Sequence, residues 1–388
     1  MSIYQEPKEH HKSGILSFFN LDTTLALLLM SLCGFGLLAL YSASRQNIDL
    51  VFGQALKLGL GCFVMLAIAH LPPKFLKYLA PPLFIIGMLC CLLIFAKIGD
   101  KYLLSVAVKG SRRWLDLGFF RFQPSEIMKL AVPMMLAYFL DKRILPPSFF
   151  TILVALLICL IPFVTILKQP DLGTSLLVIF PALCVIFLAG LGMRYILTAV
   201  LAIATGAPLF WEYIMTDYQK QRVFTFLDPE SSPLKSGYQV IQSKIAIGSG
   251  GMYGKGWLNS TQVNLQFLPE ATTDFIYAVI AEEFGLVGLS VLLGVYLLII
   301  LRCFMISIQA RDTFFKLLGA SITISLFANI FINGAMVSGI LPVVGLPLPL
   351  ISRGGTSIIA LFASFGILMN IYSHRLIKPK KKKFSDYD

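Results

Sequence analysis

Charged residues and histidines are scarce in this sequence of 388 residues. Asp, Glu, Lys and Arg make up 13% of the chain and hydrophobic residues 57%, whereas soluble domains carry about 25% charged residues. This composition excludes a soluble globular protein. The only histidines are His10, His11, His70 and His374, at tails or at the edges of apolar runs. A Ser-His-Asp hydrolase and an HExxH metalloprotease are therefore excluded, and the lack of a Gly-x-x-x-x-Gly-Lys-Ser/Thr loop argues against an ATP-driven pump.

Cysteine pairs with metal-site spacing are also absent. The seven cysteines lie inside or at the ends of apolar runs: Cys33, Cys62, Cys90, Cys91, Cys159, Cys184 and Cys303. No CxxC pair occurs, so neither a disulfide framework nor a zinc site is expected. The first long apolar run is not followed by a small-residue cleavage site, so no removable signal peptide is expected.

Long apolar runs are abundant. They reach about 18 residues or more, the length that a helix needs to cross a bilayer. A membrane barrel would alternate in polarity over about ten residues, and runs such as 155–167 and 290–301 do not. We therefore predict an all-α, polytopic membrane protein with about ten spans. They are expected at 22–43, 51–71, 78–97, 124–141, 148–167, 171–190, 194–214, 273–302, 313–337 and 352–372.

The distribution of positive charge predicts the orientation of these spans. The net charge is +12, and a Lys/Arg cluster follows the last span between residues 375 and 383. Such clusters favour the cytoplasmic side, and an even number of spans places both termini there. The chain then divides into a cytoplasmic N-terminal tail (1–21), one transmembrane domain (22–375) and a basic cytoplasmic tail (376–388).

Two longer segments on the predicted outer side are also basic. Residues 98–123 interleave aromatic residues with Arg112, Arg113 and Arg121, which favours an anion-binding mouth at the interface. Residues 215–272 form a large loop between spans seven and eight. Two interpretations of its basic residues stay open, an anion-binding segment and a merely solvated loop. Within it, 238–247 fits a short amphipathic helix on the membrane, followed by a glycine cluster.

One candidate site surrounds the start of the eighth span. Pro269 and two threonines favour a helix start, which places Asp274 in the first helical turn at the outer interface. A carboxylate stabilised by the helix N-terminus is the simpler interpretation. Glu282 and Glu283 lie deeper, where an ionisable group points to function, although structural pairing with a cation explains them equally well.

Three further places put charged side chains or irregular backbone at the same face of the membrane. The fourth span opens with Arg121-Phe-Gln-Pro-Ser-Glu126-Ile-Met-Lys129. Within it, Glu126 and Lys129 are spaced for an ion pair on one helix face, and a purely structural ion pair is the alternative to a functional one. Lys168-Gln-Pro-Asp171 places a cation and an anion between spans five and six. The Gly/Pro-rich segment 339–357, which includes Ser352, cannot form a lipid-facing helix, so it must be buried or line a cavity.

These four motifs, in this order, resemble the SEDS (shape, elongation, division and sporulation) proteins of bacteria over about residues 22–375. The run from Gly237 to Gly251, with Gly254-Lys-Gly-Trp-Leu, is more similar to the RodA elongation branch than to the FtsW division branch. Arg353 departs from the pattern, which more often has an aromatic residue there.

The resemblance implies a peptidoglycan glycosyltransferase that polymerises lipid II into β-1,4 glycan strands on the outer face of a bacterial cytoplasmic (inner) membrane. It also implies a class B penicillin-binding protein as partner within the elongation machinery, and no nucleic acid. Asp274 matches the family's essential carboxylate. Arg121, Glu126, Lys129 and Asp171 match positions important for activity. From charge placement we add Lys168, Arg112 and Arg113, and from the irregular segment Ser352, as substrate-binding candidates.

The expected reaction inverts configuration at the donor sugar. Asp274 would act as general base on the acceptor 4-hydroxyl, and the cations would hold the pyrophosphate leaving group. No cofactor is certain. A divalent cation, Mg²⁺ or Mn²⁺, would fit between carboxylate and pyrophosphate, but the sequence shows no cluster of metal ligands. A lipid II flippase or other transporter, or a noncatalytic scaffold, are the alternatives. The absence of a visible internal repeat weakens the hypothesis of an inverted-repeat transporter.

Overall fold

Long helices dominate the structure, a computed structural model that describes residues 21–98, 101–102, 105–108, 111–116, 118, 121–215, 220, 223–224 and 236–375. The long helices are α2 (Thr23–Ala43), α3 (Ile48–Ala69), α4 (Pro73–Leu93), α5 (Pro124–Asp141), α6 (Phe149–Leu167), α7 (Leu172–Leu188), α8 (Met193–Leu209, continued by a π-helical turn η1, Phe210–Ile214), α12 (Ile276–Ile308), α13 (Thr313–Val337) and α14 (Thr356–Ser373). These helices match the ten predicted spans. The two tails, 1–20 and 376–388, lie outside the described residues.

Eight helices in the described part of the chain are long and apolar enough to cross a membrane. The other two predicted spans fall short for visible reasons. Helix α7 has only 17 residues, and α5 carries Glu126, Lys129 and Asp141 within 18 residues. Both pack inside the bundle, where α5 buries most of one side against its neighbours. The prediction of an all-α polytopic membrane protein is confirmed.

Residues 98–123 contain strands, which the sequence did not predict. Strands β1 (Lys97–Ile98) and β2 (Lys101–Tyr102) form one antiparallel pair, and β3 (Ser105–Val108), β4 (Ser111–Asp116) and β5 (Arg121–Phe122) form a three-stranded antiparallel sheet in the order β3-β4-β5. The strands are two to six residues long, too short to give a recognisable alternation. They fix the direction in which the basic side chains of this segment point.

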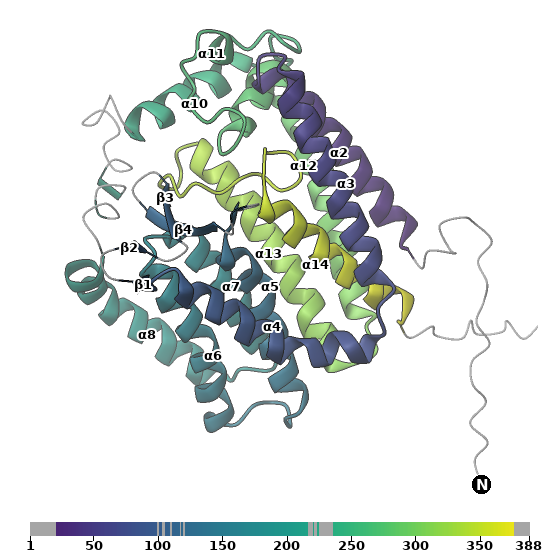
Figure 1. The fold of residues 1–388 in the computed structure, drawn as a ribbon, viewed down its shortest axis with the longest axis vertical. Helices are drawn as coiled ribbons and strands as arrows, with labels where there is room; N and C mark the ends of the chain where they lie inside the picture. Colours follow the sequence, from purple (N-terminus) through teal and green to yellow (C-terminus); the bar gives the residue numbers. More distant parts are fainter. Residues whose placement is uncertain are drawn as a thin grey trace, which may run out of the picture.

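The segment between α8 and α12 contributes helix α10 (Ser236–Gly250) and the short α11 (Thr261–Asn264). The predicted helix at 238–247 is thus confirmed. Figure 1 shows α10 and α11 at the end of the bundle where α12 begins. Ser243 anchors α10 to α13, because its Oγ donates to the carbonyl of Val337 at 2.8 Å.

The close approach of α10 to α12 depends on Gly250. A Cβ built on Gly250 would overlap the carbonyl oxygen of Ala281, whereas a Cβ on Gly248 meets nothing within 4 Å. We expect Gly250→Ala to destabilise the protein by about 1–3 kcal/mol, the usual effect of overpacking. Gly248→Ala in the same helix serves as the matched control. Thermal unfolding followed by intrinsic fluorescence measures both, and equal unfolding temperatures would contradict this packing.

Helix α12 is interrupted at Gly285, whose φ is +64°. The backbone groups freed there are satisfied by the loop that follows α10. The amides of Lys255 and Gly256 donate to the carbonyls of Glu282 and Glu283, each at 3.0 Å, and the amide of Leu286 donates to the carbonyl of Gly251. Non-helical backbone at membrane depth requires such partners, and the loop after α10 supplies them through Gly251, Lys255 and Gly256.

Ion pairs join the helices at the opposite end of the bundle. Asp22, the N-cap of α2, pairs with Arg302 of α12. Lys77 of α4 pairs with Asp141 of α5, whose other oxygen accepts from the amide of Phe314 at 3.0 Å. The amide of Asp22 also contacts Met369 of α14, so the two described chain ends lie close together (Figure 1).

Candidate functional site

The irregular segment 339–355 crosses the bundle interior between α13 and α14. Val344, Leu346 and Leu348 are buried, as the prediction for this Gly/Pro-rich run required. The carbonyl of Pro349 accepts from the hydroxyl of Tyr296 at 2.6 Å. The carbonyl of Leu346 accepts from Asn333 Nδ2 at 2.7 Å. Irregular backbone is thereby satisfied by side chains of α12 and α13.

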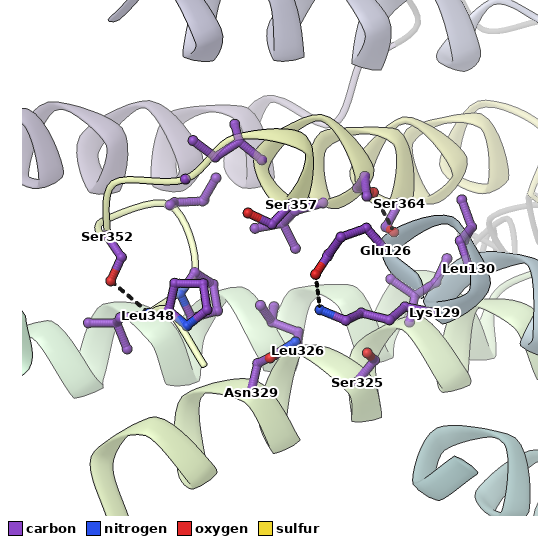
Figure 2. A pocket seen from close by; sticks show the side chains of 18 of the residues that line it. Glu126, Lys129, Leu130, Ser325, Leu326, Asn329, Leu348, Ser352, Ser357 and Ser364 are labelled. Atoms are coloured by element: carbon purple, nitrogen blue, oxygen red, sulfur yellow. Dashed lines mark hydrogen bonds and ion pairs between the residues drawn. The ribbon is translucent and has the colours of Figure 1, made fainter. Parts of the chain in front are cut away.

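A cleft lies between α5, α13, α14 and this segment. It contains about 800 Å³ of empty space, including the part open to its surroundings. Figure 2 shows the side chains that line it, with polar groups facing one another across the space. The polar lining residues are Glu126, Lys129, Ser321, Ser325, Asn329, Ser352, Ser357 and Ser364. So many polar groups within a membrane bundle indicate a binding site for a polar ligand.

Glu126 and Lys129 form the only ion pair among the described residues that line this cleft. Their Oε1 and Nζ atoms are 2.7 Å apart, and the side chains are 11% and 14% exposed. Pro124 begins α5 at a position where proline is favoured. Glu126 in the first turn also interacts favourably with the helix dipole. The predicted pairing on one helix face is confirmed, and its cation faces the cleft (Figure 2).

Asp274 lies beside the irregular segment, in a turn before α12. The prediction that it falls in the first helical turn is wrong, because amides of Thr273 and Phe275 bond to the carbonyl of Glu270 and the helix starts at Ile276. The N-cap of α12 is Phe275, which makes no side-chain cap hydrogen bond, and stabilisation of the Asp274 carboxylate by the nearby helix N-terminus stays an alternative interpretation. A Cβ built on the exposed Gly345 would lie 3.4 Å from Asp274 Oδ2.

Two polar side chains hold the Asp274 turn against the segment. Asn333 Nδ2 donates to the carbonyl of Asp274 at 2.9 Å as well as to that of Leu346. Ser352 Oγ donates to the carbonyl of Thr273 at 2.5 Å and accepts from the amide of Leu348. Since Ser352 and Leu348 also line the cleft, Asp274 lies next to the cleft without lining it.

Asp171 is buried at a junction of three elements. One oxygen accepts from Gln123 Nε2 at 2.9 Å and the other lies 3.3 Å from Arg113 Nη1, while the side chain caps α7 through the amide of Thr174. Its cation is therefore Arg113 of β4 and not the neighbouring Lys168, which is exposed at the end of α6. Gly173 packs on the carbonyl of Val344, so Asp171 helps to position the irregular segment.

Arg121 and Arg112 point elsewhere. Arg121 is 61% exposed and its Nε lies 2.8 Å from Asp116 Oδ2. The amide of Gly118 and the Arg121 guanidinium lower the pKa of Asp116, so this ion pair persists into more acidic solution than an ordinary Asp would allow. Arg112 Nη1 donates to the carbonyl of Ser105 in the same sheet. Neither arginine lines the cleft, and their role as phosphate ligands stays a prediction.

Sequence reasoning missed most of the polar lining. Ser321, Ser325, Asn329 and Asn333 recur at every fourth position along α13, and residues four apart lie on one helix face. This stripe was a readable signal in an otherwise apolar span. It was overlooked because no single member belongs to a charged motif.

Glu282 and Glu283 have structural partners. Glu282 is fully buried and accepts from Lys255 Nζ at 2.6 Å, from Ser260 Oγ at 2.5 Å and from Thr261 Oγ1 at 2.6 Å. Glu283 accepts from Ser42 of α2. The alternative of structural pairing thus describes Glu282, which fastens the loop 255–262 to α12.

We expect Glu282→Ala to destabilise the protein by about 3 kcal/mol or more, because it leaves Lys255 and two hydroxyls without their buried acceptor. Glu282→Gln, which keeps an acceptor oxygen, should destabilise it less. Thermal unfolding measures both. A variant of normal stability whose activity has lost its pH dependence would instead indicate a role in proton transfer.

A divalent cation has few protein ligands here. The described residues contain no group of three or more His, Cys, Asp or Glu side chains placed to hold a metal ion.

Comparisons with known proteins agree with this architecture. The family described as cell cycle protein, comprising FtsW, RodA and SpoVE, matches residues 23–376. The peptidoglycan glycosyltransferase MrdB of Escherichia coli K12 is 47% identical over 361 residues, which cover 93% of this chain and 96% of MrdB. A probable peptidoglycan glycosyltransferase FtsW of Geobacter metallireducens is 35% identical over 366 residues, covering 90% and 94%.

Solved structures show the same fold. RodA, the rod shape determining protein of Thermus thermophilus, superposes with a TM-score of 0.69 at 28% identity, covering 92% of this chain and 98% of RodA. A chain from a peptidoglycan synthase complex, studied for its coordination of polymerization and crosslinking, gives a TM-score of 0.78 at 33% identity, covering 92% and 98%. The chain therefore belongs to the FtsW, RodA and SpoVE family of cell cycle proteins.

Proposed function

We propose that this protein is a peptidoglycan glycosyltransferase of the RodA branch, which polymerises lipid II into β-1,4 glycan strands for cell elongation. The observation that carries the proposal is the polar cleft. In it, the Glu126–Lys129 pair faces the irregular segment 339–355, and Asp274 lies beside the same segment. The names of the similar proteins support the same activity.

Asp274 is the general base in this proposal. It takes the proton from the 4-hydroxyl of the acceptor sugar as that oxygen attacks C1 of the donor, and the bond from C1 to the pyrophosphate oxygen breaks on the opposite side. An α-linked donor then gives a β-linked product. General base catalysis of this kind contributes about 10²–10⁴-fold.

Lys129 stabilises the leaving group. Negative charge grows on the pyrophosphate as the bond breaks, and a fixed cation in a partly dehydrated cleft stabilises such charge strongly. Glu126 orients Lys129 through the 2.7 Å ion pair between their side chains. Arg121, Arg112, Arg113 and Lys168 are further proposed binding groups for the substrate, and Asp171 positions Arg113. A divalent cation, when present, would add charge neutralisation beside Asp274.

The cleft and Asp274 belong to the outer side in the proposed orientation. The described chain ends lie together at the end of the bundle that carries Arg302 and Lys77, which suits a cytoplasmic location of both tails. The protein is a multi-pass membrane protein, and we place it in the bacterial inner membrane. A class B penicillin-binding protein is the proposed partner, supported by the similarity to a chain of a peptidoglycan synthase complex.

Two assays on the purified protein separate this proposal from a flippase. Incubation with lipid II should yield glycan polymer, and a vesicle translocation assay should show no lipid II transfer that depends on the protein. Transfer of lipid II across the bilayer without polymer formation would contradict the proposal and support the transporter hypothesis instead.

A further inference from the structure

Two cations that no motif accounts for meet at the outer part of the bundle. Lys57 lies on α3, nine residues and therefore about 14 Å from the helix start. Arg353 lies in the irregular segment just before α14. Lys57 Nζ lies 3.2 Å from the carbonyl oxygen of Gly354, the residue after Arg353, although Lys57 and Arg353 are separated by almost 300 positions in the chain.

The backbone around Arg353 is held rigidly between α3 and the Asp274 turn. Gln54, one turn before Lys57, donates to the carbonyl of Ser352 at 3.1 Å and accepts from the amide of Gly354 at 3.3 Å. Lys57 Nζ donates to the carbonyl of Gly354 at 3.2 Å. The amide of Arg353 donates to the carbonyl of Thr272 at 2.8 Å. Four hydrogen bonds thus position the two cations between α3, the irregular segment and the turn before α12.

Neither cation has a counter-ion among the described residues. No ion pair within 4.0 Å joins Lys57 or Arg353 to another residue there. Lys57 is half-buried and Arg353 exposed. Two like charges at membrane depth repel each other and are costly unless they serve a function. An anion placed between them would relieve both effects.

The position of the pair identifies the class of anion. Ser352 and Gly354, on either side of Arg353, line the cleft, so the cations stand at its edge. A guanidinium and an ammonium together suit a phosphate group, and anions that reach this depth of a bilayer are carried on lipids. We propose that Lys57 and Arg353 form a phosphate-binding site for a lipid at the edge of the cleft.

Two lipid sources share this chemistry, an isoprenoid-linked pyrophosphate and an anionic phospholipid headgroup. Only the assignment to a substrate pyrophosphate rests on the proposed function. In that case the site would hold a second lipid-linked phosphate, apart from the one beside Lys129.

Lipid binding to the full-length protein tests the site. The protein is placed in phosphatidylcholine nanodiscs and titrated with undecaprenyl pyrophosphate or with phosphatidylglycerol, and bound lipid is counted by native mass spectrometry. Lys57→Met and Arg353→Gln should each weaken the binding of one of these lipids about tenfold or more, since each removes a charged hydrogen-bond donor. The control is Lys316→Met, which changes an exposed lysine near the start of α13 and should leave both affinities unchanged.

The pattern of loss assigns the source. Weaker binding of undecaprenyl pyrophosphate alone identifies the substrate-type lipid, and weaker binding of phosphatidylglycerol alone identifies a phospholipid headgroup. Unchanged affinity for both in the two variants overturns the site. If Lys57→Met does not fold, the exposed Arg353→Gln decides. Because the assay involves no turnover, a wild type that binds lipid but forms no polymer would contradict the proposed function and leave this site standing.

Discussion

Lys129→Met should lower the rate of glycan polymerisation by about 10²–10³-fold, the usual effect of losing one group that stabilises developing negative charge. It should also destabilise the protein by about 3 kcal/mol, because Glu126 is then left as a buried charge without a partner. Polymer yield on gels and thermal unfolding measure the two effects.

A double variant separates catalysis from folding at this pair. Glu126→Gln combined with Lys129→Met removes both charges, and replacing a whole buried ion pair with neutral groups is often nearly neutral for stability. The double variant should therefore unfold near the wild-type temperature and still fail to polymerise. If it regained both stability and activity, the pair would be a structural ion pair only.

Asp274→Asn should reduce polymerisation by about 10²–10⁴-fold while lipid II binding is retained. The substitution removes the proton acceptor but keeps the size of the side chain, and the hydrogen bonds that hold the turn use the backbone carbonyls of Thr273 and Asp274. Asp312→Asn, at the exposed start of α13, is the matched control and should be fully active. Polymerisation by Asp274→Asn at the wild-type rate would exclude Asp274 as the base.

Much of the fold could be predicted from hydropathy alone. A span is defined by its apolar length, a local property, so two of the ten predicted ranges agree with the helices to the residue, 124–141 and 313–337. The eighth span ends at Ile308 and not at residue 302, and the third span starts at Pro73 and not at residue 78. Proline at a helix start is favourable, and Pro81 and Pro82 are accommodated inside this helix.

Prediction was weaker where tertiary contacts choose between partners. Glu126 and Lys129 lie three residues apart, so their pairing was readable from the sequence. Asp171 pairs with Arg113 because a sheet that hydropathy could not show brings β4 to the start of α7. Likewise Glu282 meets Lys255 only because the loop after α10 folds back onto α12.

The irregular segment shows why the location of the site could be predicted from the sequence while its contacts could not. Its prolines and glycines excluded a lipid-facing helix, and that argument correctly placed it inside the protein. Its contacts with Asn333, Gln54 and Tyr296 depend on side chains from three separate helices. Spacing along the chain contains no information about such contacts.

A structure of the Asp274→Asn protein with bound lipid II tests the central claim most directly. We predict the pyrophosphate within hydrogen-bond distance of Lys129, and the acceptor 4-hydroxyl beside residue 274 when a second sugar is present. A pyrophosphate bound at the opposite end of the bundle, near Lys77 and Arg302, would contradict the account.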